Sequence, residues 1–595
     1  MKQRVADFIA DYLADNGVTQ VFSVVGGGAM HLNNAFGTNK RLNVLYNHHE
    51  QASAIAAESY SRIHNQVATV CVTSGPGGTN ALTGVLCAFL DNLPMIIISG
   101  QVRYDITVES TGLNLRQFGE QEYQIIKSAA PMTKYAVMIK DAYTIKHHLD
   151  KALYLARTGR RGPCWIDVPL NIQGQIIETD GLIGYTPEEI PKSDKTVINT
   201  IINEIENSKR PVIIAGSSIR TSGSLKTFYE LTDTLKLPVI CPTSTVDVMA
   251  HDDTYYYGMF GSFGGRTGNF IVQNADLIIA LGCRLSFKQI GFNFETFSPL
   301  SRKIVVDVDP EELKKPTIHI DIPICADVSD IICSLNACDF DCALDEKQTW
   351  LEYCAFLKQK FHVLEHYDRD SINAYQFADI FYKKLHANSV VVLGNNCASV
   401  SMLQKGIQIR GQRMYGNVNC GTMGYDLPAA IGASVALGNT VYCLTGEGTF
   451  QMNLQELQTI VHNKLPIKIV VFNNNSYQAI VQTQTNFFNA VFSGCTVDSG
   501  ISFPSFEKLA YAYGFPFRSI SRGIDIENAI DWIVQEPGSA ILELIQTEPD
   551  SISPKLSSKR LDDGSIVSPP IDDISPFLTE EEYTCCSYEH FAGDR

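Results

Sequence analysis

The sequence predicts an α/β fold with three doubly wound parallel-sheet domains. Its 595 residues are too many for one hydrophobic core. Short apolar runs alternate with stretches of helical periodicity along most of the chain, as in parallel sheets whose strands are joined by helices. The alternation is interrupted by a polar connector near residues 174–195 and by a helical linker near residues 336–370. We therefore expect domains at 1–175, 190–335 and 365–550, followed by a loop-rich tail at 551–595.

In the first domain, an amphipathic helix is expected at residues 1–16, and strands are expected near 20–24, 42–46, 68–73, 95–99 and 163–167. Glu50 follows the second of these strands and precedes a helical stretch, 52–62. An acidic residue that stabilises a helix N-terminus is one interpretation of this position. Residues 73–80 likewise join a strand to a helix, in a tight turn suited to an anion.

The second domain is expected to contain strands near 211–215, 238–241, 276–281 and 303–308. In the third domain, a strand at 389–393 leads to Asn395 and Asn396. A further strand at 441–444 ends in Gly446-Glu447-Gly448, a helix is expected at 452–462, and the strand at 466–472 stops before Asn474. The first and third domains share a similar alternation of strands and helices.

The turn at Glu447 and the loop at Asn474 should meet, because the carboxyl ends of parallel strands face one crevice. A carboxylate, an amide oxygen and a backbone carbonyl are hard ligands, which Mg²⁺ takes at about 2.0–2.1 Å. The pattern predicts a site for a divalent metal and a diphosphate. An ordinary strand-helix-strand unit with a glycine turn is the alternative, because short glycine motifs are weak signals.

Composition narrows the class of protein. The net charge of −17 argues against nucleic acid or an anionic membrane as the main partner. No apolar run is long enough to span a bilayer. The 16 cysteines are scattered without a C-x-x-C pair, which favours reduced thiols over disulfides or zinc. We expect a cytoplasmic protein whose partners are small molecules.

The run from Gly446 to Leu457, together with Asn473-Asn474, resembles the thiamine diphosphate motif of the acetolactate synthase and pyruvate decarboxylase superfamily. The resemblance extends over about residues 1–545. It implies a pyrimidine-binding first domain, a central FAD/NAD-like domain and a diphosphate-binding third domain. The family has Asp where this chain has Glu447. The implied Mg²⁺ ligands are Glu447, the side chain of Asn474 and the backbone carbonyl of Ser476; the implied diphosphate contacts are Asn395, Asn396, Gly446 and Gly448.

His49-Glu50-Gln51 resembles the segment whose glutamate bonds the pyrimidine nitrogen of the cofactor. That contact promotes the tautomer that takes the proton from the reacting carbon, so Glu50 is the implied catalytic acid-base group. Gln121 aligns with a residue that reaches the donor or acceptor. Other implied cofactor contacts are Gly27 in the glycine loop, Pro76 and Asn80 in the turn after the third strand, the carbonyl of Gly421, and Met423, which forces the cofactor to bend.

The resemblance implies an enzyme that decarboxylates a 2-oxo acid, with pyruvate the first candidate, and passes the acyl carbanion to a carbonyl acceptor. Thr483 stands where the family has a tryptophan in the acceptor pocket, which suggests a larger, more polar acceptor. Residues 560–570 resemble the tails of homologues from surface-polysaccharide gene clusters, whose acceptors are thought to be keto-sugars. The alternatives are a true acetolactate synthase, a simple 2-oxo acid decarboxylase and a non-catalytic regulatory subunit.

Two further expectations rest on the resemblance. Residues 257–261 and 282–284 resemble the flavin-binding parts of acetolactate synthases, and residues 306–311 resemble the segment on the adenosine side. Ser286-Phe287-Lys288 departs from the family sequence, so the resemblance leaves two alternatives, with and without bound FAD. The family also places its activating glutamate and its diphosphate site on different subunits. A homodimer or homotetramer with active sites at the subunit interface is therefore expected.

Overall fold

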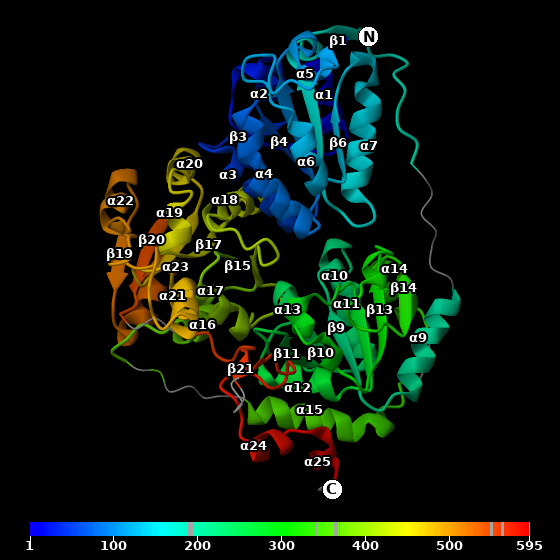
Figure 1. Ribbon diagram of the computed structural model, residues 1–595, viewed down its shortest axis with the longest axis vertical. Coiled ribbons are helices and arrows are strands. Elements are labelled where there is room, and N and C mark those ends of the chain that lie inside the picture. The colour runs from blue at the N-terminus through cyan, green and yellow to red at the C-terminus, as the bar shows by residue number, and fades with distance from the viewer. Residues whose placement is uncertain are drawn as a thin grey trace.

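The computed structural model describes residues 1–187, 195–338, 342–361, 367, 369–547, 551–560 and 565–593. Within these residues the chain forms three six-stranded parallel sheets flanked by helices, which confirms the predicted fold class. Figure 1 shows the first sheet at the top, the second at the lower right and the third at the left.

The first sheet has the strand order β3-β2-β4-β5-β7-β6. Its main helices are α1 (Val5–Asp15), α2 (Met30–Thr38), α3 (Glu50–His64), α4 (Pro76–Leu90), α6 (Ile125–Ala129) and α7 (Ile145–Arg157). Its strands are β2 (Gln20–Ser23), β3 (Asn43–Tyr46), β4 (Ala68–Val72), β5 (Met95–Gln101), β6 (Tyr135–Met138) and β7 (Pro163–Pro169).

The third sheet has the order β16-β15-β17-β18-β20-β19. Its strands are β15 (Val390–Leu393), β16 (Arg413–Gly416), β17 (Val441–Gly446), β18 (Ile467–Asn473), β19 (Phe517–Ile520) and β20 (Ala540–Ile545). Its helices are α16 (Ala374–Lys384), α17 (Cys397–Lys405), α18 (Asp426–Leu437), α19 (Glu447–Gln451), α20 (Glu456–Asn463), α21 (Gln478–Phe487), α22 (Phe506–Tyr513) and α23 (Ile526–Gln535). When strands are counted within their own sheet, the first and third sheets share one order, 2-1-3-4-6-5.

The middle sheet differs, with the order β11-β10-β9-β12-β13-β14. Counted within the sheet, this order is 3-2-1-4-5-6, the arrangement of dinucleotide-binding folds. Its strands are β9 (Pro211–Ala215), β10 (Val239–Pro242), β11 (Tyr256–Phe260), β12 (Leu277–Leu281), β13 (Arg302–Asp307) and β14 (Ile322–Cys325). Its main helices are α9 (Lys195–Asn207), α10 (Ser218–Thr221), α11 (Leu225–Leu235), α12 (Arg266–Asn274), α13 (Phe287–Ile290) and α14 (Val328–Asn336).

The first and third domains are joined by the packing of α3 against α18. A Cβ added at Gly432 would lie 2.0 Å from the carbonyl oxygen of Ala56, so the helices meet at their backbones and only glycine fits. The Ser59 hydroxyl donates to the carbonyl of Ala429 at 2.6 Å. One apolar core continues from the first sheet into the third. The two domains are therefore fixed relative to each other within one chain.

Two expected helices differ in the structure. Residues 1–16 begin with β1 (Lys2–Arg4), which pairs with β8 (Ile176–Glu178), and only then form α1. The helix expected at 452–462 begins only at Glu456, after a turn at residues 452–455 in which the buried Asn453 side chain donates to the carbonyl of Gly424 at 2.6 Å. This turn separates α19 from α20 and ties the Glu447 segment to the loop before α18.

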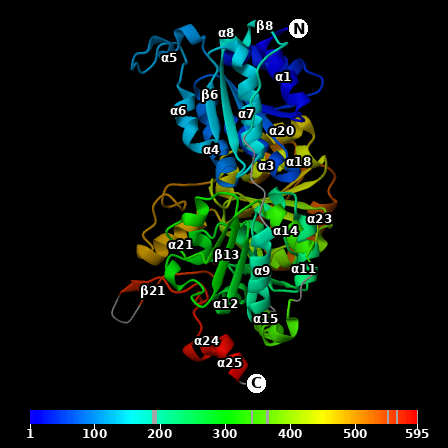
Figure 2. The ribbon, with the colours of Figure 1, turned by 90° about the vertical axis from the view of Figure 1, so that its right-hand side faces the viewer.

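The tail, residues 551–560 and 565–593, runs along the middle domain and ends in α24 (Glu580–Thr584) and α25 (Tyr588–Gly593). Figure 2 shows these two helices at the end of the molecule opposite the N-terminus. The side chain of Asn269 donates to the carbonyl of Ile571 at 2.6 Å. The hydroxyl of Tyr353, in α15 (Gln348–Lys360), donates to the carbonyl of Cys586 at 2.6 Å. Among the described helices, none has the length and apolarity needed to cross a membrane.

Candidate active site

The predicted meeting of Glu447 and Asn474 is present. β17 and β18 are parallel neighbours, with Gly446 opposite Phe472. Glu447 begins α19, and its Oε1 accepts the backbone amides of Asn474 at 3.1 Å and Ser476 at 2.9 Å. The turn after one strand is thus bonded to the loop after the next, because both loops lie at the carboxyl edge of the sheet.

The environment of Glu447 suits a cation. Its side chain is buried, and burial raises its pKa to about 7 even though the backbone amides of the 474–476 loop favour the ionised form. Within the described residues, no lysine, arginine or histidine forms an ion pair with it. The Oδ1 of Asn474 lies 2.6 Å from the Ser476 hydroxyl, which donates to it. A buried carboxyl beside an amide oxygen is a donor set that fits Mg²⁺ when phosphates complete the coordination.

Asn395 and Asn396 follow β15 at the same edge of the third sheet. The Oδ1 of Asn396 accepts the backbone amide of Ser399 at 2.9 Å and so caps α17. Its Nδ2 atom is buried and has no hydrogen-bond partner among the described residues. Such a donor costs about 1–3 kcal/mol unless it is satisfied. Because Asn396 lies against Gly446, this donor fits a phosphate oxygen held at the turn.

Met423 and Gly448 pack together beside this set. A Cβ added at Gly448 would lie 2.2 Å from Cε1 of Tyr477 and 3.1 Å from Cε of Met423, so the turn leaves no room for a side chain. The backbone amide of Gly424 donates to the Thr449 hydroxyl at 2.7 Å. The Asn395 side chain donates to the carbonyl of Gly421. The loop that carries Gly421 and Met423 is therefore held over the start of α19.

The first domain brings together a second set of predicted residues. Glu50 is the first residue of α3 and is buried, and the Asn80 side chain donates to its Oε2 at 3.0 Å. Pro76 begins α4 after Gly75, which has a φ of +58°. A Cβ at Gly75 would lie 2.6 Å from the carbonyl oxygen of Gln121.

The glycine loop lies next to this turn. Gly27 begins a short 3₁₀ turn (Gly27–Ala29), and a Cβ at the adjacent Gly28 would lie 2.5 Å from the Ser74 hydroxyl. The glycine loop, the Pro76 turn and Glu50 thus gather at the carboxyl edge of the first sheet.

Within one chain, no hydrogen bond or ion pair in the described segments joins Glu50 or Asn80 to Glu447, Asn474 or Met423. The start of α3 contacts the third domain elsewhere. The Asn47 side chain donates to buried Glu456 at 2.9 Å, and Asn453 donates to Gln51 at 3.3 Å. The structure therefore contains two separate clusters of predicted site residues.

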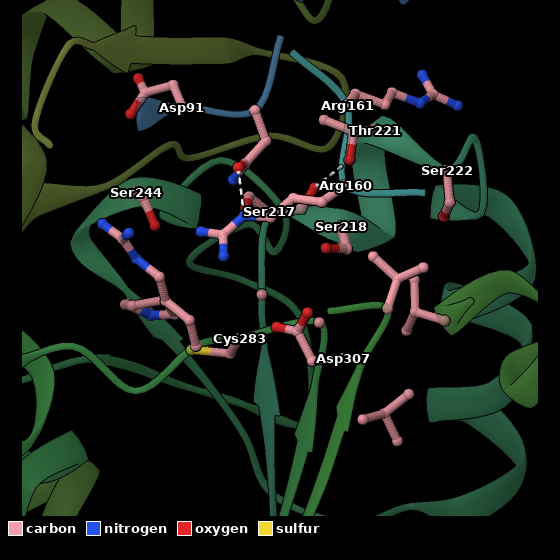
Figure 3. A pocket seen from close by; sticks show the side chains of 18 of the residues that line it. Asp91, Arg160, Arg161, Ser217, Ser218, Thr221, Ser222, Ser244, Cys283 and Asp307 are labelled. Atoms are coloured by element: carbon pink, nitrogen blue, oxygen red, sulfur yellow. Dashed lines mark hydrogen bonds between the residues drawn. The ribbon is translucent and has the colours of Figure 1, made fainter. Parts of the chain in front are cut away.

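A third polar site lies in the middle domain. Figure 3 shows a cavity with Asp307 and Cys283 below and Ser217, Ser218 and Arg160 above. Its floor is the carboxyl edge of β9, β12 and β13, where the strand order reverses and open α/β sheets bind ligands.

Two arginines at this cavity were not predicted from the sequence. Arg160 pairs with Asp309 at 3.0 Å and with Glu312 at 2.7 Å. Arg161 donates to Asn65 at 2.5 Å, and in the described chain no carboxylate pairs with it. Burial lowers the pKa of its guanidinium. The sequence feature that could have identified both arginines is their position between two glycines, just before the strand that begins at Pro163.

Family comparisons match all three domains. Residues 3–123 match the N-terminal TPP binding domain of thiamine pyrophosphate enzymes, residues 198–335 match their central domain, and residues 394–544 match their C-terminal TPP binding domain. The chain belongs to the thiamine diphosphate-dependent enzymes. It therefore forms or cleaves carbon–carbon bonds with the help of this cofactor.

Within that class the chain is acetolactate synthase-like. It is 28% identical over 579 residues to the acetolactate synthase large subunit of Pyropia yezoensis, covering 94% of this chain and 95% of the relative. It is 29% identical over 574 residues to acetolactate synthase 1, chloroplastic, of Zea mays, covering 93% and 87%. It is 28% identical over 557 residues to the acetolactate synthase isozyme 2 large subunit of Escherichia coli (strain K12), covering 92% and 96%.

Proposed function

We propose that this enzyme decarboxylates a 2-oxo acid, with pyruvate the first candidate, and transfers the resulting acyl group to a carbonyl acceptor. The observation that carries the proposal is the buried carboxyl of Glu447 beside Asn474, together with the Nδ2 of Asn396, which has no hydrogen-bond partner within the described residues. Together they offer ligands for a metal and a donor for a phosphate at one edge of the third sheet.

Glu447, the Asn474 side chain and the backbone carbonyl of Ser476 would hold Mg²⁺, with Asn395, Asn396 and the backbone of Gly446 and Gly448 around the diphosphate. When bound, thiamine diphosphate supplies an acidic carbon that adds to the 2-oxo acid and accepts the electron pair released with CO₂. Met423 would press on the cofactor from the loop above α19.

Glu50 would act on protons rather than on phosphates. Its carboxyl accepts a hydrogen bond from the Asn80 side chain, and its Oε1 would lie 3.7 Å from a Cβ at Gly77, so it faces the turn that begins α4. A carboxyl held against a ring nitrogen of the cofactor can share a proton with it, which sets the protonation state of the opposite amino group. Gln121 would contact the substrate.

We propose that two copies of the chain combine the two clusters. Apolar side chains are exposed beside both of them. Val25 and Met30, next to the glycine loop, are 59% and 52% exposed. In the described third domain, α21 buries none of its residues; its last residue, Phe487, and Val491 in the segment that follows are 63% and 72% exposed. Such patches are typical of protein interfaces, which favours a homodimer or a larger even assembly.

We propose the kind of acceptor, its size and polarity, from the presence of Thr483. This residue lies on α21, where its hydroxyl donates to the carbonyl of Ala479 at 3.0 Å, and its side chain is exposed. A small residue in place of the family's tryptophan leaves space for a polar acceptor such as a keto-sugar. The second candidate is acetolactate synthesis, which the names of the relatives favour.

We also propose that the middle-domain cavity binds FAD. The strand order, the serine hydroxyls and Arg161, which has no carboxylate partner within the described residues, fit the phosphates and ribose of a dinucleotide. The visible absorption spectrum of the purified protein tests this. A flavin spectrum that Arg161→Ala weakens would support the proposal, and a colourless protein that takes up no added FAD would contradict it.

The catalytic proposal is tested by measuring CO₂ release from pyruvate and other 2-oxo acids with thiamine diphosphate and Mg²⁺ present. Absence of release from every acid would overturn it. Mass spectrometry of the products, with and without a panel of keto-sugars and aldehydes, separates the two candidates. Acetolactate from pyruvate alone, increased by Thr483→Trp, would identify an acetolactate synthase.

A further inference from the structure

The first domain contains a cavity of about 410 Å³ that the proposed cofactor contacts leave unused. Its floor lies near the carboxyl ends of β5, β7 and β6, the three strands at one side of the first sheet. Its wall consists of side chains from two segments, residues 107–114 and 122–127, which include α5 (Val108–Thr111) and the start of α6. Figure 2 shows α5 and α6 along one side of the first domain. Cavities of about 300–1,000 Å³ commonly bind small molecules.

The wall of the cavity is held in place by hydrogen bonds. Glu122 is buried, and its carboxylate accepts the backbone amides of Val108 at 2.5 Å and Gly119 at 3.1 Å. The side chain of Gln101, the last residue of β5, donates to the carbonyl of Tyr123 at 2.8 Å. The wall is thus bonded both within itself and to the sheet, as in pre-formed binding sites.

The cavity adjoins the Glu50 cluster through the turn that begins α4. A Cβ at Gly75, in this turn, would lie 2.6 Å from the carbonyl oxygen of Gln121. A Cβ at Gly78 would lie 2.9 Å from Cγ1 of Ile125, which lines the cavity. Glu50 faces the same turn. Gln121 has a φ of +61°, a conformation that residues other than glycine rarely adopt and that is found preferentially at functional sites.

Three polar side chains at the cavity have free hydrogen-bonding groups, those of Asn114, Gln124 and Lys127. Among the described residues, none of these side chains forms a hydrogen bond or an ion pair. The carboxylate of Glu109, which also lines the cavity, pairs with Lys140. Lys127 is exposed, so it places at the opening a positive charge that no carboxylate of the described chain compensates.

The floor of the cavity combines a buried acid with apolar side chains. Asp167 accepts the Ser99 hydroxyl at 2.6 Å and the Gln101 amide at 3.1 Å. Burial raises the pKa of Asp167 to about 7, so near neutral pH its carboxyl can donate to a hydroxyl group as well as accept from one. Met138 and Val108 lie beside it and offer apolar contacts. Such a floor suits a molecule that carries both hydroxyl groups and C–H surface.

We propose that this cavity is the acceptor subsite, and that the acceptor is a polyhydroxylated carbonyl compound with one negatively charged group, either a phosphate or a carboxylate. This assignment of the acceptor rests on the proposed function. Asp167 and the free amides bind the hydroxyl groups, Lys127 binds the anionic group, and the carbonyl carbon lies at Gln121, next to Glu50. The charge of the acceptor is therefore selected by the first domain.

The reaction with such an acceptor is balanced. The 2-oxo acid loses CO₂, and its acyl carbon forms a bond to the carbonyl carbon of the acceptor. The acceptor's carbonyl oxygen takes up one proton and becomes a hydroxyl group. The anionic group and the other hydroxyl groups of the acceptor take no part in the chemistry, so they are free to remain bound in the cavity.

Three sugars test the subsite with the full-length enzyme: fructose 6-phosphate, 2-ketogluconate and uncharged fructose. Isothermal titration measures the binding of each sugar in the absence of pyruvate. Mass spectrometry with pyruvate, thiamine diphosphate and Mg²⁺ measures the products and the KM of each acceptor. We expect at least one charged sugar to bind, and its KM to be about tenfold lower than that of fructose, the size of effect expected for a hydrogen bond to a charged group. The tighter of the two charged sugars identifies the anionic group.

Variants separate the charge from the hydroxyl contacts. Lys127→Gln should abolish the tenfold preference for the charged sugar, whereas Lys127→Arg should keep it. Asn114→Ala should raise the KM of the charged sugar and of fructose by similar factors. The control is Lys40→Gln, an exposed lysine before β3 at the opposite edge of the same sheet, which should behave like the parent.

A preference for the charged sugar that Lys127→Gln leaves intact would overturn the role of Lys127. Failure of all three sugars to bind and to react would overturn the assignment of the cavity. If the enzyme releases no CO₂ from any 2-oxo acid, the proposed function fails, and the titrations with the parent, Lys127→Gln and Asn114→Ala still decide whether the cavity binds an anionic sugar.

Discussion

The first and third domains have the same strand order, and each gathers its predicted site residues at the carboxyl edge of its sheet. Their chemistry differs. The first domain holds a buried carboxyl, Glu50, against a side-chain amide, whereas the third holds Glu447 against two backbone amides beside an amide oxygen. One topology thus positions two unlike half-sites. The sheet topology thus determines where a site forms, and the side chains of the loops determine its chemistry.

The largest expected difference between the first and third domains lies in the roles of their buried carboxyls, Glu50 and Glu447. Glu50→Gln keeps the size and the polar contact but removes the proton-sharing group. We expect CO₂ release to fall by about 10³-fold, in the range for loss of an acid-base group, with little change in the affinity for Mg²⁺. Steady-state kinetics and metal titration measure both. Unchanged turnover would contradict the assignment and favour a non-catalytic subunit.

Equivalent strands of the first and third sheets each carry a buried carboxyl, Asp167 on β7 and Glu543 on β20. Burial raises the pKa of Asp167 to about 7, although Ser99 and Gln101 donate to it. The folded state then binds a proton that the unfolded state releases near pH 4. This contribution to stability is fully present below about pH 4 and is lost as the pH rises through 7.

Asp167→Asn should therefore flatten the pH dependence of the free energy of unfolding between about pH 4 and 7. Because the NH₂ group of Asn would face Ser99 or Gln101, which both donate to Asp167, the substitution loses one hydrogen bond at every pH. Between pH 4 and pH 8 we expect the stability of the variant relative to the parent to rise by about 2–4 kcal/mol, because only the parent has to release the proton of Asp167. Urea unfolding over this pH range measures the effect. Glu543→Gln is the matched control, and an identical change of profile in both variants would show a general charge effect instead.

In the third domain, Glu447→Gln should weaken metal binding while excess Mg²⁺ restores part of the turnover. We expect the affinity for Mg²⁺ to fall at least about 10–100-fold, because loss of a residue that only contacts a metal ligand already has an effect of this size. Isothermal titration with Mg²⁺ and thiamine diphosphate measures it. Glu447→Asp is the conservative control. If Glu447→Gln bound Mg²⁺ as tightly as the parent, the proposed ligand set would be wrong.

The glycines of the two half-sites should respond unequally to a methyl group. Gly448→Ala places a Cβ 2.2 Å from the Tyr477 ring, whereas a Cβ at Gly27 meets no atom within 4 Å. Overpacking of this kind costs about 1–3 kcal/mol. Thermal unfolding should show a lower melting temperature for Gly448→Ala alone. Equal melting temperatures for the two variants would show that Tyr477 moves aside freely.

The strands predicted from the sequence are mostly interior ones, such as β4, β5, β9 and β18, whose buried runs of Val and Ile are unambiguous. Among the strands not predicted, β6, β14, β16 and β19 lie at sheet edges. Edge strands are short and carry polar or charged residues, so their pattern is weak. Arg413 and Arg518 lie in two of them. Interior β20 was also not predicted, since Glu543 interrupts its apolar run.

The sequence by itself determined the three-domain α/β class, the family, and the meeting of Glu447 with the Asn474 loop. These features are local, because a strand, a helix and the next parallel strand bring their ends together at one edge. The tertiary structure alone decided two others: within the described chain, the buried Nδ2 of Asn396 has no hydrogen-bond partner and no carboxylate pairs with the Arg161 guanidinium. They depend on packing between distant segments, and no spacing in the chain specifies which side chains meet across such a contact.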